Sequence, residues 1–306
     1  MRNKFAEALY RLSRSDPRIH IVVADISPAG PMNEFRKEFP ERFINVGVAE
    51  QSMIGICAGL ALKGMLPFAY TIATFALYRP FEMVRDDLCY QNLPVTVVGI
   101  GGGVIYSTLG GTHYAQEDIT IAGAIPNMSI LAPCDPAEAT AATEYLVGAD
   151  RKGPCYLRFG KAGEPDITKD AIEPFRFGKL RYLRRGRDVA ILSYGVTMGL
   201  AVKAAAALAD KGKSVSVIGC PTVKPLDREG VIEVLRSHPR VVVAEENAPR
   251  GGLASEVKSV AWDIQARCAL QTITLKDEFV HCYGSHEDLL AAHGLSVPAI
   301  VAAAGG

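Results

Sequence analysis

Three segments in the first half of the chain hold residues that could do chemistry, and the first surrounds Glu50. Residues 46–51 read VGVAEQ, so Glu50 lies between an apolar strand end and an apolar helix. Water solvates a carboxylate poorly in such a place, and burial favours its neutral acid form. The simpler alternative is a carboxylate that stabilises the positive end of a helix. The pattern therefore indicates either a tuned acid or a helix-start residue at Glu50.

The second segment is a stripe of aromatic side chains within residues 73–85 (ATFALYRPFEMVR). Phe75, Tyr78 and Phe81 recur at helical spacing, which is typical of side chains that pack into a core. The same spacing would also suit a platform on which the flat ring of a cofactor stacks. Spacing alone leaves both interpretations open.

The third segment is a glycine-rich loop that carries one histidine, His113. Residues 99–118 (GIGGGVIYSTLGGTHYAQED) follow an apolar run directly, and glycines let a backbone approach a ligand closely. The loop matches neither common phosphate-binding motif, so no P-loop is predicted. His281, Cys282 and His286 lie close together, but no fourth zinc-type ligand follows them. We therefore predict no metal site within this chain.

These segments need a scaffold, and short β-branched runs that alternate with helical patterns predict one. Residues 93–100 (LPVTVVGI) are almost wholly apolar, which is typical of a strand buried in a parallel sheet. Asp135 and Pro136 open a helix as its N-cap and first residue. The fold class is therefore α/β, with mostly parallel sheets flanked by helices. In such open sheets, ligands bind beyond the carboxyl ends of the strands.

The alternation lapses once and then restarts, which predicts two domains. Residues 166–184 are rich in charge and contain a proline, and we interpret them as a linker. A first domain then spans residues 1–165, and a second spans residues 185–306. No catalytic constellation stands out in the second domain, which we expect to organise a dimer.

The composition argues against several classes of protein. Lysine plus arginine number 33 and aspartate plus glutamate number 33, so no basic excess favours nucleic acid or an anionic membrane. No apolar stretch reaches the roughly 18 residues of a membrane span, and the N-terminus lacks the apolar core of a signal peptide. The seven scattered cysteines form no CxxC motif, and we interpret them as free thiols of a reducing cytoplasm.

The order of the motifs resembles that of the transketolase family. Residues 46–78 (VGVAEQSMIGICAGLALKGMLPFAYTIATFALY), 93–103 (LPVTVVGIGGG) and 109–118 (LGGTHYAQED) resemble its pyrimidine-binding domain. Residues 222–227 (TVKPLD) and 245–257 (EENAPRGGLASEV) resemble its C-terminal domain. In that family thiamine diphosphate lies between two subunits. The resemblance therefore implies a thiamine diphosphate pyrimidine-binding domain followed by a transketolase C-terminal domain.

The resemblance also implies a partner subunit. The family holds the diphosphate and its Mg²⁺ on a separate domain with a Gly-Asp-Gly motif, and this sequence contains no Gly-Asp-Gly. We therefore expect the beta-type half of a split transketolase, active only with a second polypeptide that carries that domain. By analogy the assembly is an α2β2 heterotetramer with a two-fold contact between copies of this chain. It would transfer a two-carbon ketol unit from a ketose to an aldose or other aldehyde.

The resemblance assigns roles to individual residues. Glu50 matches the glutamate that bonds the pyrimidine ring nitrogen and activates the cofactor. Phe75 and Tyr78 match aromatic residues that pack on that ring, and His113 matches a histidine that contacts oxygens of the donor substrate. The remaining matches are Arg158 and Arg2 at the substrate's terminal phosphate, and Asp25 near the subunit and cofactor interface.

Three positions depart from the family pattern. Leu109 stands where the family has an acid that reads the configuration of a substrate hydroxyl. A family loop histidine falls at about Gly101–Gly103, and a serine that helps to hold phosphate falls at Ala29. These departures imply weaker phosphate binding or another anionic end group, and the sequence does not decide between phosphate, sulfonate and a neutral end.

Three alternative functions stay open. The beta subunit of 2-oxo acid dehydrogenases has the same layout, and deoxyxylulose-phosphate synthase uses the same domains but starts from pyruvate. Residues 109–118 fit transketolases better than the corresponding dehydrogenase loop. The third alternative is a non-catalytic α/β regulatory subunit that keeps the fold. The joint presence of Glu50, the aromatic pair and His113 argues against it.

Overall fold

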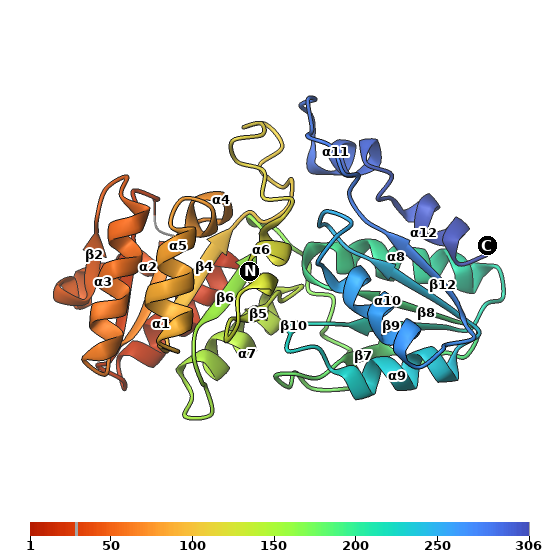
Figure 1. Cartoon of the computed structure of the whole chain (residues 1–306), viewed down its shortest axis with the longest axis horizontal. Helices are drawn as coiled ribbons and strands as arrows, with labels where there is room; N and C mark the ends of the chain where they lie inside the picture. Colours follow the sequence, from red (N-terminus) through yellow and green to blue (C-terminus); the bar gives the residue numbers. More distant parts are fainter. Residues whose placement is uncertain (28–29, 306) are drawn as a thin grey trace.

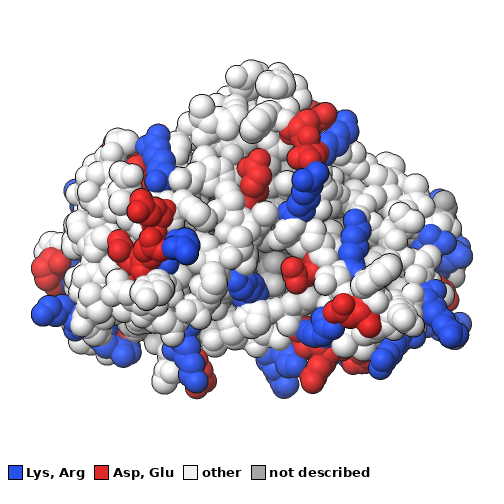
Figure 2. Space-filling model, in the orientation of Figure 1, with Lys and Arg blue, Asp and Glu red and all other residues white. Residues whose placement is uncertain are grey.

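The chain forms two α/β domains that lie side by side, in a computed structural model that describes residues 1–27 and 30–305 (Figure 1). Each domain is built on one mostly parallel sheet with helices on its faces, so the predicted fold class is confirmed. Charged side chains of both signs are interspersed over the face drawn in Figure 2, in keeping with the balanced composition. In the part of the chain that the structure describes, no helix is both long and apolar enough to cross a membrane.

The sheet of the first domain places the carboxyl ends of six parallel strands along one edge. Its strands run in the order β5-β6-β4-β3-β1-β2. Apart from the edge strand β2, they are mostly buried, because apolar clusters cover both faces of the sheet. Their bounds are β1 (Ile19–Val23), β2 (Phe43–Asn45), β3 (Leu66–Ile72), β4 (Thr96–Ile100), β5 (Ser129–Leu131) and β6 (Cys155–Phe159).

Helices fill both faces of this sheet. One face carries α1 (Arg2–Ser13), α2 (Gly30–Glu38) and α7 (Pro136–Val147), which pack on one another. The N-cap predicted at Asp135 is confirmed, because its carboxylate accepts a hydrogen bond from the Glu138 N–H at 2.8 Å. The other face carries α3 (Glu50–Leu62), α4 (Ala73–Leu77), α5 (Phe81–Met83), the π-helix η2 (Val84–Tyr90) and α6 (Asp118–Ala124).

The second domain repeats the plan with a five-stranded sheet in the order β12-β11-β8-β9-β7, of which only β7 is antiparallel. Its strands are β7 (Arg181–Arg184), β8 (Val189–Ser193), β9 (Val215–Gly219), β11 (Arg240–Ala244) and β12 (Ala269–Ile273). Its helices are α8 (Met198–Asp210), α9 (Arg228–Ser237), α10 (Leu253–Asp263), α11 (His286–Ala292) and α12 (Val297–Ala303).

The two domains share strands and core. Strand β10 (Thr222–Lys224) comes from the second half of the chain, yet it pairs antiparallel with β5 and closes the edge of the first sheet. One apolar cluster runs without interruption from α3 and η2 into α9 and α10. The domains are therefore packed together firmly, and loops of one domain can be held by side chains of the other.

Candidate functional site

The predicted site residues gather at the carboxyl edge of the first sheet. Glu50 begins α3 in the connection after β2, and Phe75 lies on α4 directly after β3. His113 lies on the loop that follows β4. Open α/β sheets bind ligands in the crevice beyond the carboxyl ends of their strands. The topology thus brings together three residues that are up to 63 positions apart in the sequence.

Glu50 is buried and ion-paired with Arg79. The carboxylate is 5% exposed, and Nη1 of Arg79 donates to both of its oxygens, at 3.0 and 3.2 Å. The sequence left two interpretations open, a tuned acid and a helix-start residue; in the structure Glu50 is the first residue of α3 and also one half of an ion pair. Arg79 follows Phe75 by four residues, which on a helix is the same face. That spacing is the sequence signal that could have identified it.

An aromatic ring and a histidine lie beside this ion pair. The guanidinium carbon of Arg79 stands 4.3 Å from the centre of the Phe75 ring. The His113 ring meets Phe75 edge-on, with 5.3 Å between the ring centres, and meets Tyr106 from 6.1 Å. Glu50, Arg79, Phe75 and His113 therefore form one continuous series of contacts.

This series tests whether the residues fit the flat ring of a pyrimidine cofactor. Arg79 already presents a planar, N–H-bearing cation that lies against Phe75 and donates to Glu50. A protonated aminopyrimidine offers the same two features, a flat face and ring N–H donors. The pair of Glu50 and Phe75 thus accepts a group of that kind, and Arg79 occupies the place that such a group would take.

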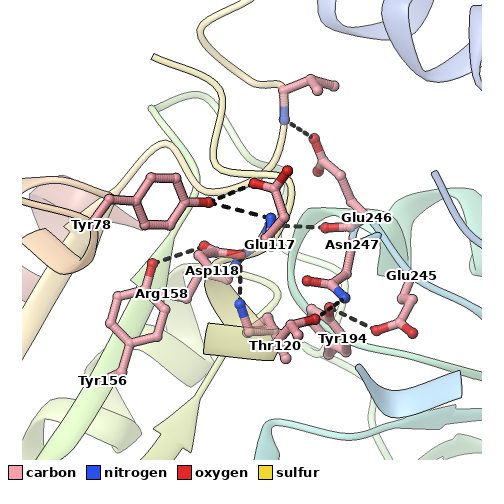
Figure 3. Close-up of polar contacts among 12 residues, drawn as sticks. Tyr78, Glu117, Asp118, Thr120, Tyr156, Arg158, Tyr194, Glu245, Glu246 and Asn247 are labelled. Atoms are coloured by element: carbon pink, nitrogen blue, oxygen red, sulfur yellow. Dashed lines mark hydrogen bonds and ion pairs between the residues drawn. The ribbon is translucent and has the colours of Figure 1, made fainter. Parts of the chain in front are cut away.

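Among the described contacts, the Tyr78 hydroxyl pairs with Glu117. The hydroxyl donates to the Glu117 carboxylate at 2.9 Å and accepts from the Glu117 N–H at 3.3 Å (Figure 3). Burial raises the pKa of Tyr78, so the phenol stays protonated and can act as this donor. The structure therefore ties Tyr78 to the far end of the His113 loop.

Arg158 is buried away from the His113 contacts, contrary to the expectation that it binds a terminal phosphate. It is 3% exposed, and its Nε donates to Asp118 at 2.8 Å while its Nη2 donates to the Glu246 carbonyl at 3.0 Å. Burial opposes its charge, but the Asp118 carboxylate raises the pKa of Arg158 and keeps it cationic. Tyr156 donates to the same carboxylate oxygen at 2.8 Å (Figure 3). These contacts make Arg158 a tie between the domains.

Two other cationic side chains, Arg2 and Lys161, lie near the loop that carries His113. Arg2 begins α1, donates to the Tyr70 hydroxyl at 2.6 Å and also reaches the Ser27 carbonyl. The Nζ of Lys161 lies 5.4 Å from the centre of the Tyr106 ring, the same ring that meets His113. Lys161 follows β6 by two residues, and no motif pointed to it.

Three further positions from the sequence analysis are Asp25, Ala29 and Leu109. Asp25 is exposed, and its backbone N–H shares the Asn45 side chain with Gly47, three residues before Glu50. Ala29, where a family serine is replaced, lies outside the described residues. Leu109 is an exposed apolar side chain on the His113 loop.

Gly102 and Gly103, at the start of the loop, leave no space for a side chain. A Cβ atom on Gly102 would lie 2.3 Å from Nε of Arg158, and one on Gly103 would lie 2.3 Å from the carboxyl carbon of Glu246. The family histidine therefore has no room here, because the two buried charges fill its space. Among the described residues, no group of three His, Cys, Asp or Glu side chains could hold a metal ion.

Comparisons with known proteins match both halves of the chain. Residues 1–163 match the model of the transketolase pyrimidine-binding domain, and residues 178–300 match that of the transketolase C-terminal domain. A structure described as a split-gene transketolase, inactive beta4 tetramer, superposes with a TM-score of 0.88 at 34% identity, covering 99% of this chain and 96% of that one.

Curated relatives carry three different activities in their names. A subunit of the apulose-4-phosphate transketolase of Phocaeicola vulgatus is 33% identical, over 96% of this chain and 93% of its own. A 6-deoxy-6-sulfo-D-fructose transketolase subunit of a Clostridium species is 36% identical, over 83% and 78%. A 1-deoxy-D-xylulose-5-phosphate synthase of Geobacter sulfurreducens is 35% identical over 98% of this chain, which spans 46% of that protein.

Proposed function

Because this chain belongs to the transketolase family, we propose that it is the pyrimidine-binding subunit of a split, thiamine diphosphate-dependent transketolase. The observation that carries the proposal is the series of contacts from Glu50 through Arg79 and Phe75 to His113. It joins an acid, a stacking surface and a substrate-facing histidine at the edge where this fold binds ligands. The joint presence of Glu50, Phe75 and His113 argues against a regulatory subunit without chemistry.

Each residue of the series has a distinct task in this proposal. Thiamine diphosphate, when bound, supplies the electron sink that lets a carbon–carbon bond of a ketose break. Glu50 holds a proton at a nitrogen of the pyrimidine ring, and Phe75 supports the face of that ring. Arg79, half exposed, turns away to admit it. His113 hydrogen-bonds oxygens of the donor sugar.

We assign the anionic end of the sugar to Arg2 and Lys161. Arg158 is committed to Asp118, whereas the Lys161 ammonium is exposed and close to the Tyr106 ring beside His113. Arg2 lies within electrostatic reach of the same Tyr106 hydroxyl. The names of the relatives include a phosphorylated and a sulfonated sugar, and two cations would accept either tetrahedral anion.

The remaining parts of the site would come from other chains. A partner subunit with a Gly-Asp-Gly motif would hold the diphosphate and its Mg²⁺, in an assembly of two copies of each chain. The description of one relative as a subunit and the inactive homotetramer of a similar chain support this dependence. Asp25, exposed near the Glu50 loop, would face that interface.

An activity assay with and without a partner tests the proposal. This chain is combined with the product of an adjacent gene encoding the diphosphate-binding domain, thiamine diphosphate and Mg²⁺. Ketol transfer to an aldehyde is followed from phosphorylated, sulfonated and neutral ketoses. We expect activity only with the partner, and a loss of about a hundredfold or more in Glu50→Gln. The exposed Glu41→Gln is the matched control.

A second variant tests the assignment of the anionic end. Lys161→Ala should raise KM for anionic donors about tenfold, because a charge-assisted contact is lost, and leave neutral donors unchanged. Lys258→Ala, an exposed lysine on α10, serves as control. An equal change in KM for charged and neutral donors would show that Lys161 does not bind the anionic end of the sugar.

One alternative has an observation in its favour. The similarity to a deoxyxylulose-phosphate synthase extends over nearly the whole chain. Pyruvate is therefore included among the donors. Consumption of pyruvate with no transfer from any ketose would overturn the transketolase proposal in favour of a pyruvate-using enzyme.

A further inference from the structure

The second domain reaches the neck of the loop that carries His113. The backbones of Gly103 and Ala115 pair across this neck with hydrogen bonds of 3.0 and 2.7 Å. The next residue, Val104, donates its N–H to Oε1 of Glu246 at 2.7 Å. Glu246 follows β11, 142 residues further along the chain. A carboxylate of the second domain therefore anchors the neck of the loop at Val104. Val104 lies on the segment that enters the loop, opposite Ala115 on the segment that leaves it.

Glu246 is held in turn by His286. Its side chain is fully buried, and Oε1 also contacts Nε2 of His286, the first residue of α11, at 2.8 Å. Burial opposes both charges, yet the carboxylate raises the pKa of His286 while His286 and Arg158 lower that of Glu246. Both contacts are made by Oε1, which is thereby held between the Val104 N–H and His286.

The exit of the loop is tied to the same segment. Arg158 joins the Glu246 carbonyl to Asp118, the first residue of α6 (Figure 3). The Ala248 N–H donates to the Gln116 carbonyl at 2.7 Å. Both ends of the loop are thus fixed to residues 246–248. Contacts that served only to join two domains would not need to converge on one loop.

We propose that Glu246, oriented by His286, is a positioning residue that fixes the loop on which His113 contacts the donor substrate. The effect on catalysis rests on the proposed function, whereas the effect on the loop itself does not. Glu246 touches neither Glu50 nor Phe75 in the described contacts, so it acts through the loop alone. The second domain accordingly takes part in substrate recognition.

Variants of His286 test the proposal without removing the buried carboxylate. His286→Ala takes away the orienting partner, while His286→Gln keeps an N–H donor at nearly the same place. His281→Ala, an exposed histidine of the same segment, is the control. With the partner subunit present, His286→Ala should raise KM for the donor ketose about tenfold and leave the half-saturating thiamine diphosphate concentration unchanged. His286→Gln should recover most of the loss.

Hydrogen exchange gives a second readout that needs no activity. In His286→Ala, amides of residues 103–117 should exchange about fivefold faster or more, while those of β4 and β6 stay protected. Unchanged amide exchange of residues 103–117 in His286→Ala would overturn the positioning role. So would an equal rise in the KM for the donor ketose and in the half-saturating thiamine diphosphate concentration. If the wild-type pair transfers no ketol group, the proposed function fails, and the exchange result still decides whether Glu246 fixes the loop.

Discussion

Arg79, which the sequence did not predict as a site residue, contacts both Glu50 and Phe75. It holds the Glu50 carboxylate and covers the Phe75 ring at the same time. Both contacts are ones that the cofactor's pyrimidine would need. On the proposed function, the guanidinium and the pyrimidine would therefore compete for one place beside Glu50 and Phe75.

This competition predicts that Arg79→Gln binds thiamine diphosphate more readily. A half-exposed ion pair contributes up to about 1 kcal/mol, so the half-saturating cofactor concentration of the complex should fall about threefold. The measurement is a cofactor titration of activity or of protein fluorescence. Arg85→Gln is the control, because Arg85 is exposed and pairs with its neighbour Asp86. A higher half-saturating concentration in Arg79→Gln would mean that Arg79 helps to hold the cofactor.

The elements around the His113 loop explain which site residues could be predicted from the sequence. Glu50, Phe75 and His113 each follow or precede a recognisable strand, so their types and positions could be interpreted locally. Glu246 and His286 could not, because their meaning depends on contact with a loop more than 140 residues away. The same holds for β10, a short strand that leaves its own domain to join the first sheet.

At the neck of the loop, Gly103 should tolerate no side chain. Its φ is +72°, in the left-handed region, and a Cβ atom would lie 2.3 Å from the Glu246 carboxyl carbon. Gly103→Ala should therefore destabilise the chain by about 2 kcal/mol or more, through backbone strain and overpacking. Chemical denaturation measures the change. Gly111→Ala in the same loop has open space around its Cβ and an ordinary φ, and should be nearly neutral. Equal effects of the two variants would contradict the tight neck.

The pair of His286 and Glu246 predicts how stability depends on pH. The pKa of His286 is raised by Glu246 and Glu287 against opposition from burial and Arg158. A raised pKa means that the folded state binds the proton more tightly. The stabilisation is then complete below the ordinary histidine value of 6.5 and is lost as pH rises through the higher folded value.

The measurement is the difference in Tm between wild type and His286→Gln from about pH 5 to about pH 9. The difference should be about 2 °C at the acidic end and vanish at the alkaline end. Glu246, whose pKa is lowered, stays ionised over this whole range. A difference that grows with pH would contradict the assigned ion pair.

At the scale of the whole molecule, one face of α3 has no partner within the described part of the chain. Val48, just before the helix, is 71% exposed, and Leu62 at its end is 63% exposed. Between them, Gly55 and Gly59 have open space where a Cβ would be. Exposed apolar surface along one helix is typical of an interaction site. Because α3 begins with Glu50, a chain that covers this face would also lie beside Glu50.

The sequence led us to expect the second domain to organise the dimer, but this exposed face favours α3 of the first domain as the two-fold contact between copies of the chain. The isolated chain should then sediment as a dimer or larger species, and Leu62→Glu should weaken self-association about tenfold or more, because a charge would be buried against apolar surface. Trp262→Glu on α10, 84% exposed and remote from Glu50 in sequence, is the matched control. Sedimentation velocity across a dilution series measures both variants. Loss of partner binding with self-association intact would instead assign the face to the other subunit. A Leu62→Glu chain that self-associates and binds its partner like wild type would leave α3 outside both interfaces. A second chain would then have to approach Glu50 across another surface.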